Sequence, residues 1–157
     1  MLSLLLVAIF QSSHAGVMFG LKKEYLFSEV EGQLLNNGVP VSNITIRQMC
    51  SGDDQVDITF ETQTDAEGRF RFAEVTQPSR FHGPFDPFSV PQLLTAIIDN
   101  KEEDLWVNAK RSTKQNSEAD GKALRLVCDL AKPLEKDKDT MLTRITRCEF
   151  VDTNLEN

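Results

Sequence analysis

Short runs in which every second residue is apolar constrain the fold of this chain most. Apolar and polar residues alternate over residues 56–60, 69–72 and 124–130, and no long segment keeps the period of an amphipathic helix. A period of two places one side of the backbone against a core and the other against water, which is typical of half-buried strands. The chain is therefore expected to be all-β.

Turn-forming residues separate these runs. Asn-Asn-Gly at residues 36–38 and Asp-Ala-Glu-Gly at residues 65–68 supply the positive φ angles and the side-chain-to-backbone bonds of tight reversals. Further strands are expected over residues 26–35, 41–50, 93–98, 105–110 and 143–150. The charged run over residues 135–139 is interpreted as a solvated loop. About seven or eight short strands predict an antiparallel, Ig-like β-sandwich.

The first fifteen residues are interpreted as a secretory signal peptide. Residues 2–10 form an apolar run with one serine, Ser3, and Ser13-His14-Ala15 has the small-x-small pattern that signal peptidase accepts. The run is too short for a membrane span, which takes about 20 residues. A buried N-terminal helix is disfavoured because no polar residues recur at a helical period. Cleavage after Ala15 would leave one periplasmic domain over residues 16–157. The positive residues that usually precede such a run are missing, which leaves open that translation begins upstream of Met1.

Export changes how the three cysteines are interpreted, because disulfides persist in oxidising compartments. Cys128 and Cys148 lie in two late apolar segments that are expected to be neighbours, and a bridge between them would stabilise the fold by about 3 kcal/mol. Cys50 has the same parity as Ile44 and Ile46, so it is expected to be a small buried thiol.

Charge and histidine content exclude several classes of function. Seventeen Lys and Arg against twenty-four Asp and Glu give a net charge of -7, which disfavours nucleic acid as a partner. Of the two histidines, one lies in the signal segment, so we expect neither a histidine-based metal site nor a bound cofactor. The acidic residues at 53–54 and 65–67 lack the spacing of a calcium loop and are interpreted as a solvated edge and a turn.

Part of the first half resembles a known sandwich family. The motifs are EGQL at residues 31–34, NGVPV at 37–41, ITI at 44–46 and TDAEGRFRF at 64–72. They are similar to the carboxypeptidase-regulatory-like, transthyretin-like β-sandwich, although Asn43 stands where that family usually has a small Ala. The resemblance implies a transthyretin-like sandwich around residues 29–75.

Later motifs resemble DUF6795, a family of small exported bacterial proteins. They are PFDPF at residues 84–88, QLL at 92–94, LW at 105–106, KR at 110–111, GKAL at 121–124, LVCDL at 126–130, and Cys148. The resemblance implies a sandwich-like first half and two late cysteines, and thus supports the Cys128–Cys148 pair. It implies no particular chemistry.

The most unusual segment is FHGPFDPF, residues 81–88. Its phenylalanines either close one end of the sandwich or form a rigid aromatic loop that binds a partner. In the second interpretation the partner-binding residues are Phe81, His82, Phe85, Asp86 and Phe88. We expect Phe81 and Phe88 to pack inward and Phe85 to be presented between two prolines. Catalysis through His82 is disfavoured because no nucleophile motif accompanies it.

Two charged segments lie near each other in the sequence. Residues 110–114, KRSTK, are interpreted as an exposed basic loop, and residues 102–104, EED, as an acidic turn. Opposed charged loops would steer the encounter with a protein partner.

Together these features favour a periplasmic, non-enzymatic module that binds another protein. By analogy with other small exported bacterial proteins, the partner would be a secreted toxin and the chain its immunity protein. The alternative is a structural or carbohydrate-binding accessory domain of the cell envelope. An enzyme would require a pocket of converging ionisable groups around His82.

Overall fold

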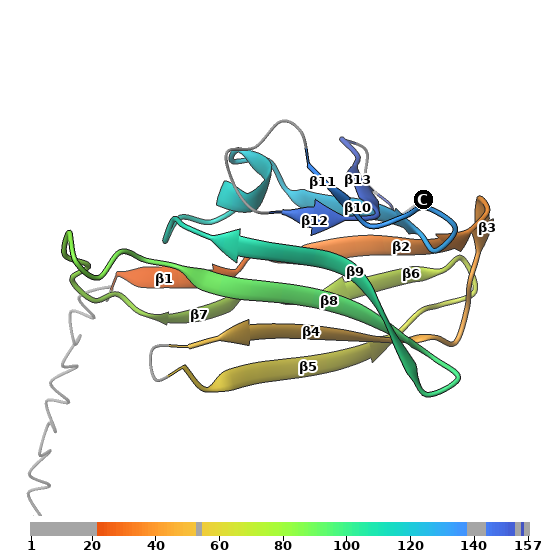
Figure 1. The fold of residues 1–157 in the computed structure, drawn as a ribbon, viewed down its shortest axis with the longest axis horizontal. Coiled ribbons are helices and arrows are strands. Elements are labelled where there is room, and N and C mark those ends of the chain that lie inside the picture. Colours follow the sequence, from red (N-terminus) through yellow and green to blue (C-terminus); the bar gives the residue numbers. More distant parts are fainter. Residues whose placement is uncertain (1–21, 53–54, 138–143, 153–154, 156–157) are drawn as a thin grey trace, which may run out of the picture.

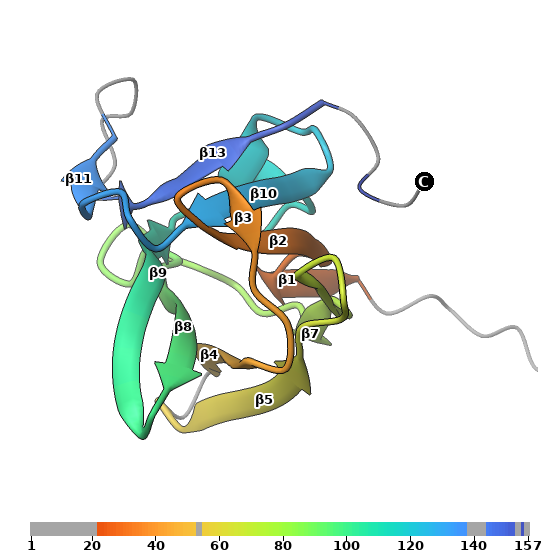
Figure 2. The ribbon, with the colours of Figure 1, turned by 90° about the vertical axis from the view of Figure 1, so that its right-hand side faces the viewer.

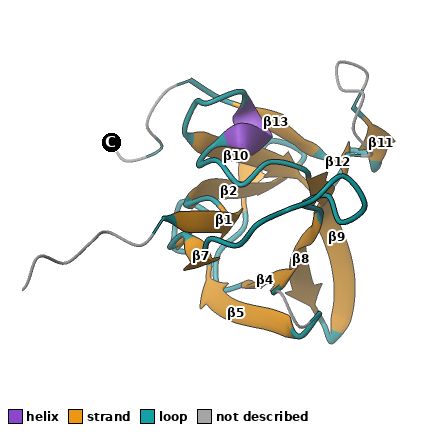
Figure 3. Ribbon diagram, turned by 90° about the vertical axis from the view of Figure 1, so that its left-hand side faces the viewer, coloured by secondary structure: helices purple, strands orange, loops and turns teal. Residues whose placement is uncertain are grey.

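The structure is a computed structural model that describes residues 22–52, 55–137, 144–152 and 155. The expected signal peptide, residues 1–15, lies outside the described residues. The strands are β1 (Lys23–Phe27), β2 (Val30–Asn36), β3 (Val39–Pro40), β4 (Thr45–Ser51), β5 (Asp57–Gln63), β6 (Arg69–Phe72), β7 (Val75–Pro78), β8 (Val90–Ile98), β9 (Lys101–Lys110), β10 (Leu124–Asp129), β11 (Glu135–Lys136), β12 (Ile145–Thr146) and β13 (Cys148–Phe150). Within the described ranges, one short 3-10 helix, η1 (Ser117–Ala119), is the only helical element (Figure 3).

The strands form three sheets arranged as a sandwich. One sheet has the order β11-β12-β9-β8-β4-β5, a second has the order β13-β10-β2-β3 with β6 also paired to β2, and β1 pairs with β7. The long strands β4, β5, β8 and β9 make one layer, and β2, β10, β1 and β7 lie across from it (Figures 1 and 2). The prediction of an all-β, sandwich-like fold is therefore confirmed.

Several predicted strands are divided, which explains why the described chain has more strands than expected. The predicted strand over residues 26–35 breaks after Phe27, so that β1 pairs with β7 and β2 pairs with β6. The predicted strand over residues 143–150 is interrupted at Arg147. At each break the chain passes from one sheet to another.

One strand pair differs from the antiparallel expectation. β10 lies parallel to β2, from Leu124 opposite Val30 to Asp129 opposite Leu35. β9 belongs to the six-stranded sheet, and the segment between Lys110 and Leu124 carries the chain across to β2 in the other layer. Alternation along a strand fixes its buried face and leaves its direction open.

The two predicted turns are confirmed. Asn37 and Gly38 have φ angles of 52° and 77°, and Gly68 has a φ of 73°. A Cβ on Gly68 would stand 2.4 Å from the carbonyl oxygen of Leu34, so the turn needs glycine for space as well as for conformation. The Asp65 carboxylate accepts hydrogen bonds from the amides at residues 67 and 69, at 3.0 and 2.7 Å. Its role is to close the turn. Residues 53–54 lie outside the described ranges.

The core lies between the layers and contains the predicted cysteine arrangement. Apolar side chains from both layers are buried, including Leu34 of β2, Ile46 of β4 and Trp106 of β9. Cys128 of β10 and Cys148 of β13 are direct cross-strand partners and form a disulfide, as predicted. Cys50 is a free buried thiol, also as predicted. Burial, and after it the nearby Asp57 carboxylate, raises the pKa of Cys50 to about 11.

The predicted burial around β5 is wrong for two residues. Phe60 is 48% exposed and Val56 is 64% exposed, although both lie in an alternating run. β5 is the edge strand of the six-stranded sheet and pairs only with β4 in the described structure. The alternation predicts the face of Phe60 correctly, but an edge strand leaves that face only partly covered.

Candidate functional site

The segment Phe81–Phe88, here called the aromatic loop, connects β7 to β8 at one end of the sandwich (Figure 1). Its tip is a reverse turn, in which the Asp86 amide donates to the Gly83 carbonyl at 3.1 Å. Pro84 occupies the second position of this turn, where its fixed φ angle is favourable. Phe85 therefore stands at the third position, at the end of the loop.

The phenylalanines of the aromatic loop differ sharply in exposure. Phe85 is 100% exposed and Phe81 is 88% exposed, whereas Phe88 is buried. The expectation that Phe81 packs inward is wrong. The residue that turns inward at this end of the loop is His82, its neighbour, and Phe81 consequently faces solvent. The predictions for Phe85 and Phe88 are confirmed.

His82 contacts a buried carboxylate. Its Nε2 atom lies 2.8 Å from Oε1 of Glu24, a β1 residue whose side chain is only 1% exposed. The same carboxylate accepts hydrogen bonds from the Arg80 amide at 3.0 Å, the Gln77 side chain at 3.1 Å and the Ser79 hydroxyl at 3.2 Å. Burial alone would raise the pKa of Glu24, but these hydrogen bonds outweigh it and hold the pKa below its ordinary value. Glu24 thus fixes the start of the aromatic loop to the sandwich.

Phe88 fixes the other end of the loop. Its ring packs edge-on against His82 with the centroids 5.3 Å apart, an arrangement that aromatic rings favour. His82, near the start of the aromatic loop, and Phe88, at its end, are therefore held against the sandwich, and the exposed residues are Phe81 and the proline-bounded tip, residues 84–87.

A pocket of about 410 Å³ lies beside the aromatic loop. Its wall combines the loop with the turn between β4 and β5, and it is lined by Leu26, Ser51, Gly52, Gln55, Gln77, Arg80, His82, Asp86, Pro87, Phe88, Ser89, Val90 and Pro91. Asp86 approaches Arg80 to 3.8 Å. The Ser51 hydroxyl donates to Asp57 at 2.9 Å. Three of the predicted site residues, His82, Asp86 and Phe88, therefore share one pocket, and Phe81 and Phe85 do not line it.

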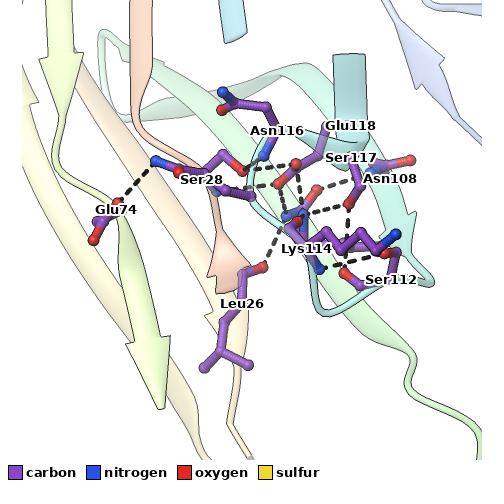
Figure 4. Close-up of polar contacts among 12 residues, drawn as sticks. Leu26, Ser28, Glu74, Asn108, Ser112, Lys114, Asn116, Ser117 and Glu118 are labelled. Carbon is purple, nitrogen blue, oxygen red and sulfur yellow. Dashed lines mark hydrogen bonds and ion pairs between the residues drawn. The ribbon is translucent and has the colours of Figure 1, made fainter. Parts of the chain in front are cut away.

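A second polar cluster was not foreseen from the sequence (Figure 4). Lys110, expected in an exposed basic loop, is buried, and its ammonium group lies 2.6 Å from a carboxylate oxygen of buried Glu118. It also donates to the Ser117 hydroxyl at 2.7 Å and to the Lys114 carbonyl at 2.9 Å. The expectation of an exposed Lys110 is wrong because a glutamate eight positions later folds back onto it.

Glu118 joins three separate parts of the chain. Its carboxylate accepts hydrogen bonds from the amide and the hydroxyl of Ser28, at 3.1 and 2.8 Å, and from the Gln92 side chain at 2.8 Å. Asn108 in turn donates to Gln92 at 2.8 Å. Burial raises the pKa of Glu118, but Lys110 and these donors lower it more, so it lies below its ordinary value. Burial lowers the pKa of Lys110, and the Glu118 charge opposes that shift.

The arrangement around Glu118 indicates a structural role. All three N–H donors of the Lys110 ammonium make hydrogen bonds, and both carboxylate oxygens of Glu118 accept them. The cluster holds the segment before η1 against the break between β1 and β2. One signal in the sequence could have located it, because Trp106, Asn108 and Lys110 share the buried parity of β9.

Other site types have no support in the described part of the chain. It contains no group of three or more His, Cys, Asp and Glu side chains able to hold a metal ion. No helix within it has the length and apolar character needed to cross a bilayer. The disulfide is consistent with an exported protein.

Comparison with known proteins identifies a family. No curated protein and no solved structure matches the chain, so the transthyretin-like resemblance stays a prediction. A family model described as a domain of unknown function, DUF6795, matches residues 30–133. The matched region contains the aromatic loop, Lys110, Glu118 and Cys128, and it ends before Cys148. The chain therefore belongs to the DUF6795 family.

Proposed function

We propose that the chain is an exported, non-enzymatic module that binds another protein in the periplasm through the aromatic loop. The observation that carries the proposal is the full exposure of Phe85, with Phe81 nearly as exposed, on a loop that His82 and Phe88 anchor to the sandwich. Exposed aromatic side chains at fixed positions are the residues that most often dominate binding energy at protein interfaces.

Rigidity of the loop supports the proposal. Pro84 and Pro87 restrict the backbone on either side of Phe85, and the His82–Glu24 contact holds the chain before them. A loop that is ordered before it binds loses little conformational entropy in the complex, so more of the contact energy of Phe85 is retained as affinity.

The chemistry around His82 supports a binding role over an enzymatic one. The Nε2 atom of His82 contacts Glu24, as the histidine of a catalytic triad contacts its acid, but the Nδ1 atom has no hydrogen-bond partner among the described residues. The Ser51 hydroxyl, which lines the same pocket, donates to Asp57. A histidine that activates a nucleophile would need to contact that hydroxyl.

Within this proposal, the partner is a secreted toxin and the chain its immunity protein. The signal-like segment Met1–Ala15 and the disulfide support export to the compartment where such a toxin would act. Carbohydrate binding, the alternative, would be favoured by aromatic rings on a flat strand face. The two most exposed rings lie on a loop instead, which favours a protein partner.

Capture of partners from a periplasmic extract tests the proposal. The bait is the mature chain, residues 16–157, as wild type, Phe85→Ala and Phe81→Ala. We expect both variants to keep the melting temperature and to weaken the complex by about 2 kcal/mol or more, as hot-spot aromatics do. Val39→Ala is the control, since Val39 is an exposed apolar residue of β3, outside the aromatic loop.

Two results would contradict the proposal. One is capture of the same partner by the wild type and both Phe variants with equal affinity. The other is a large loss of stability in Phe85→Ala, which would assign the ring to the fold. Mass spectrometry of the captured protein tests the immunity role, because a partner without toxic activity in the periplasm would exclude it.

A further inference from the structure

The outer edge of β5 carries backbone hydrogen-bonding groups that no strand of the described chain pairs with. Thr64 donates its amide to the Ile44 carbonyl at 2.9 Å, and Gly52 donates to the Val56 carbonyl at 3.1 Å. In the continuous register between these points, even-numbered residues of β5 bond to β4. The amides and carbonyls of Asp57, Thr59 and Glu61 therefore point away from β4, toward this outer edge.

This edge lacks three features that prevent strand addition, namely lysine, proline and a β-bulge, although it carries two acidic residues. Natural edge strands are protected by lysine, proline or a β-bulge. The sequence of β5, DITFETQ, contains neither residue, and its register with β4 runs without a shift from Thr45 opposite Gln63 to Ser51 opposite Asp57. With seven residues, β5 is long enough to accept a short extended peptide.

The two faces of β5 differ in chemistry. Phe60 and Ile58 share the core face with buried Gln48 and Cys50, their partners on β4, yet Phe60 is nearly half-exposed. The opposite face presents Asp57 and Glu61. The cation next to Glu61 is Arg47, which is shared with Glu102. The face of β5 that carries Asp57 and Glu61 therefore keeps a negative charge, and the core face keeps an exposed apolar surface.

We propose that β5 accepts an extended segment of a partner protein as an added antiparallel strand. The segment has apolar residues on the side that packs beside Ile58 and Phe60, and Lys or Arg on the side that faces Asp57 and Glu61. Backbone bonds supply affinity in this mode of recognition, and alternate side chains supply specificity. Strand addition does not depend on binding by the aromatic loop, although Gln55, just before β5, lines the pocket beside that loop.

Charge disfavours a second copy of the chain as the occupant. Each copy has a net charge of -7 and would bring the same acidic edge. One antiparallel self-pairing, centred on Thr59, would place Asp57 directly opposite Glu61, and like charges in that position destabilise a strand pair. A basic segment of a different protein has neither disadvantage.

A peptide probe tests strand addition on the mature chain. The probe is acetyl-Lys-Val-Lys-Val-Lys-Val-Lys-amide, and amide hydrogen exchange is followed by NMR. We expect saturating peptide to slow exchange at Asp57, Thr59 and Glu61 at least tenfold and to change Ile58 and Phe60 little, since the latter already bond to β4. If the peptide does not slow exchange at Asp57, Thr59 and Glu61, the inference is overturned.

The variant Thr59→Pro tests the backbone contact. It removes the central outward-pointing donor without removing a β4–β5 hydrogen bond. We expect at least a tenfold loss of affinity for the probe, whereas the matched control Thr59→Ala keeps it. A probe with Glu in place of each Lys should bind at least tenfold more weakly. Equal binding of the Lys probe to wild type and Thr59→Pro means charge adsorption alone, and this result contradicts the inference.

Two further measurements distinguish strand addition at β5 from binding by the aromatic loop and from self-association. Phe85→Ala should bind the probe like the wild type, so failure of the aromatic-loop proposal leaves this result untouched. Analytical ultracentrifugation should find no dimer. A dimer that Thr59→Pro dissociates would identify a second copy as the occupant and overturn the choice of a basic partner. If Thr59→Pro does not fold, the exchange pattern of the wild type decides alone.

Discussion

Gln48 lies in the middle of β4 with its side chain buried, and neither its Oε1 nor its Nε2 atom has a hydrogen-bond partner among the described residues. Its cross-strand neighbours are Phe60 and Leu94. A buried amide without partners costs about 1–3 kcal/mol. We therefore expect Gln48→Met, which fills similar space without polar atoms, to raise the free energy of unfolding by about 1 kcal/mol in urea titrations.

The control for this residue is another buried glutamine. Gln92 donates to the Leu26 carbonyl and to Glu118, both at 2.8 Å, so Gln92→Met should destabilise the protein. Destabilisation by Gln48→Met as well would mean that the Gln48 amide is satisfied in solution.

For single residues, the sequence predicted which alternate side chains of a strand are buried better than it predicted which side chains contact each other. The alternation in 124–130 correctly predicted buried Leu124, Leu126 and Cys128. The sequence around His82 could not reveal that this side chain turns inward, because the cause is its contact with Glu24, 58 residues away in the chain. Lys110 was misassigned for the same reason: a local run of basic residues indicates a solvated loop until Glu118 is known to contact it.

Among the elements, the segment between β9 and β10 contains a buried ion pair. Lys110 and Glu118 hold this segment against the β1–β2 break. We expect Lys110→Met to lower the free energy of unfolding by about 3–5 kcal/mol, because it leaves the Glu118 charge buried without its cation. Adding Glu118→Gln should restore part of that loss, since the amide carbonyl still accepts from Ser28 and the uncompensated charge is gone.

Chemical denaturation of the single and double variants measures this coupling. Lys122→Met is the matched control, because Lys122 pairs with Asp152 at 3.1 Å with both side chains largely exposed, and such pairs contribute about 0–1 kcal/mol. A double variant less stable than Lys110→Met would show that the cluster depends on hydrogen bonds of Glu118 more than on its charge.

The burial of alternate residues was predictable for strands with one fully covered face, and less predictable for strands at the edge of a sheet. β10 and β6 have buried alternate residues, as their sequences predict. β5 has the same kind of pattern, but Phe60 lies on an edge strand and stays partly exposed. A strand's place in its sheet depends on long-range pairing, which local alternation does not encode.

For the whole molecule, two buried carboxylates contribute to how stability changes in acid. The pKa values of Glu24 and Glu118 are held below their ordinary value of 4.5, at which the unfolded chain titrates them. Below pH 4.5 the unfolded state therefore binds protons that the folded state does not, and the stability these carboxylates contribute is lost as pH falls through their folded pKa values. Above that range the contribution is fully present.

We expect the contribution of these two groups to the free energy of unfolding to be nearly constant between pH 7 and 5 and to fall below about pH 4.5. General charge acts in the opposite direction at first, because a chain with a net charge of -7 loses self-repulsion as acids are protonated. Glu24→Gln and Glu118→Gln separate the two effects. Each variant should be less stable than the wild type at pH 7, and its stability should depend less steeply on pH between 4.5 and 3. Urea titrations at stepped pH provide the measurement, and equally steep curves for the wild type and both variants would assign the acid transition to general charge instead.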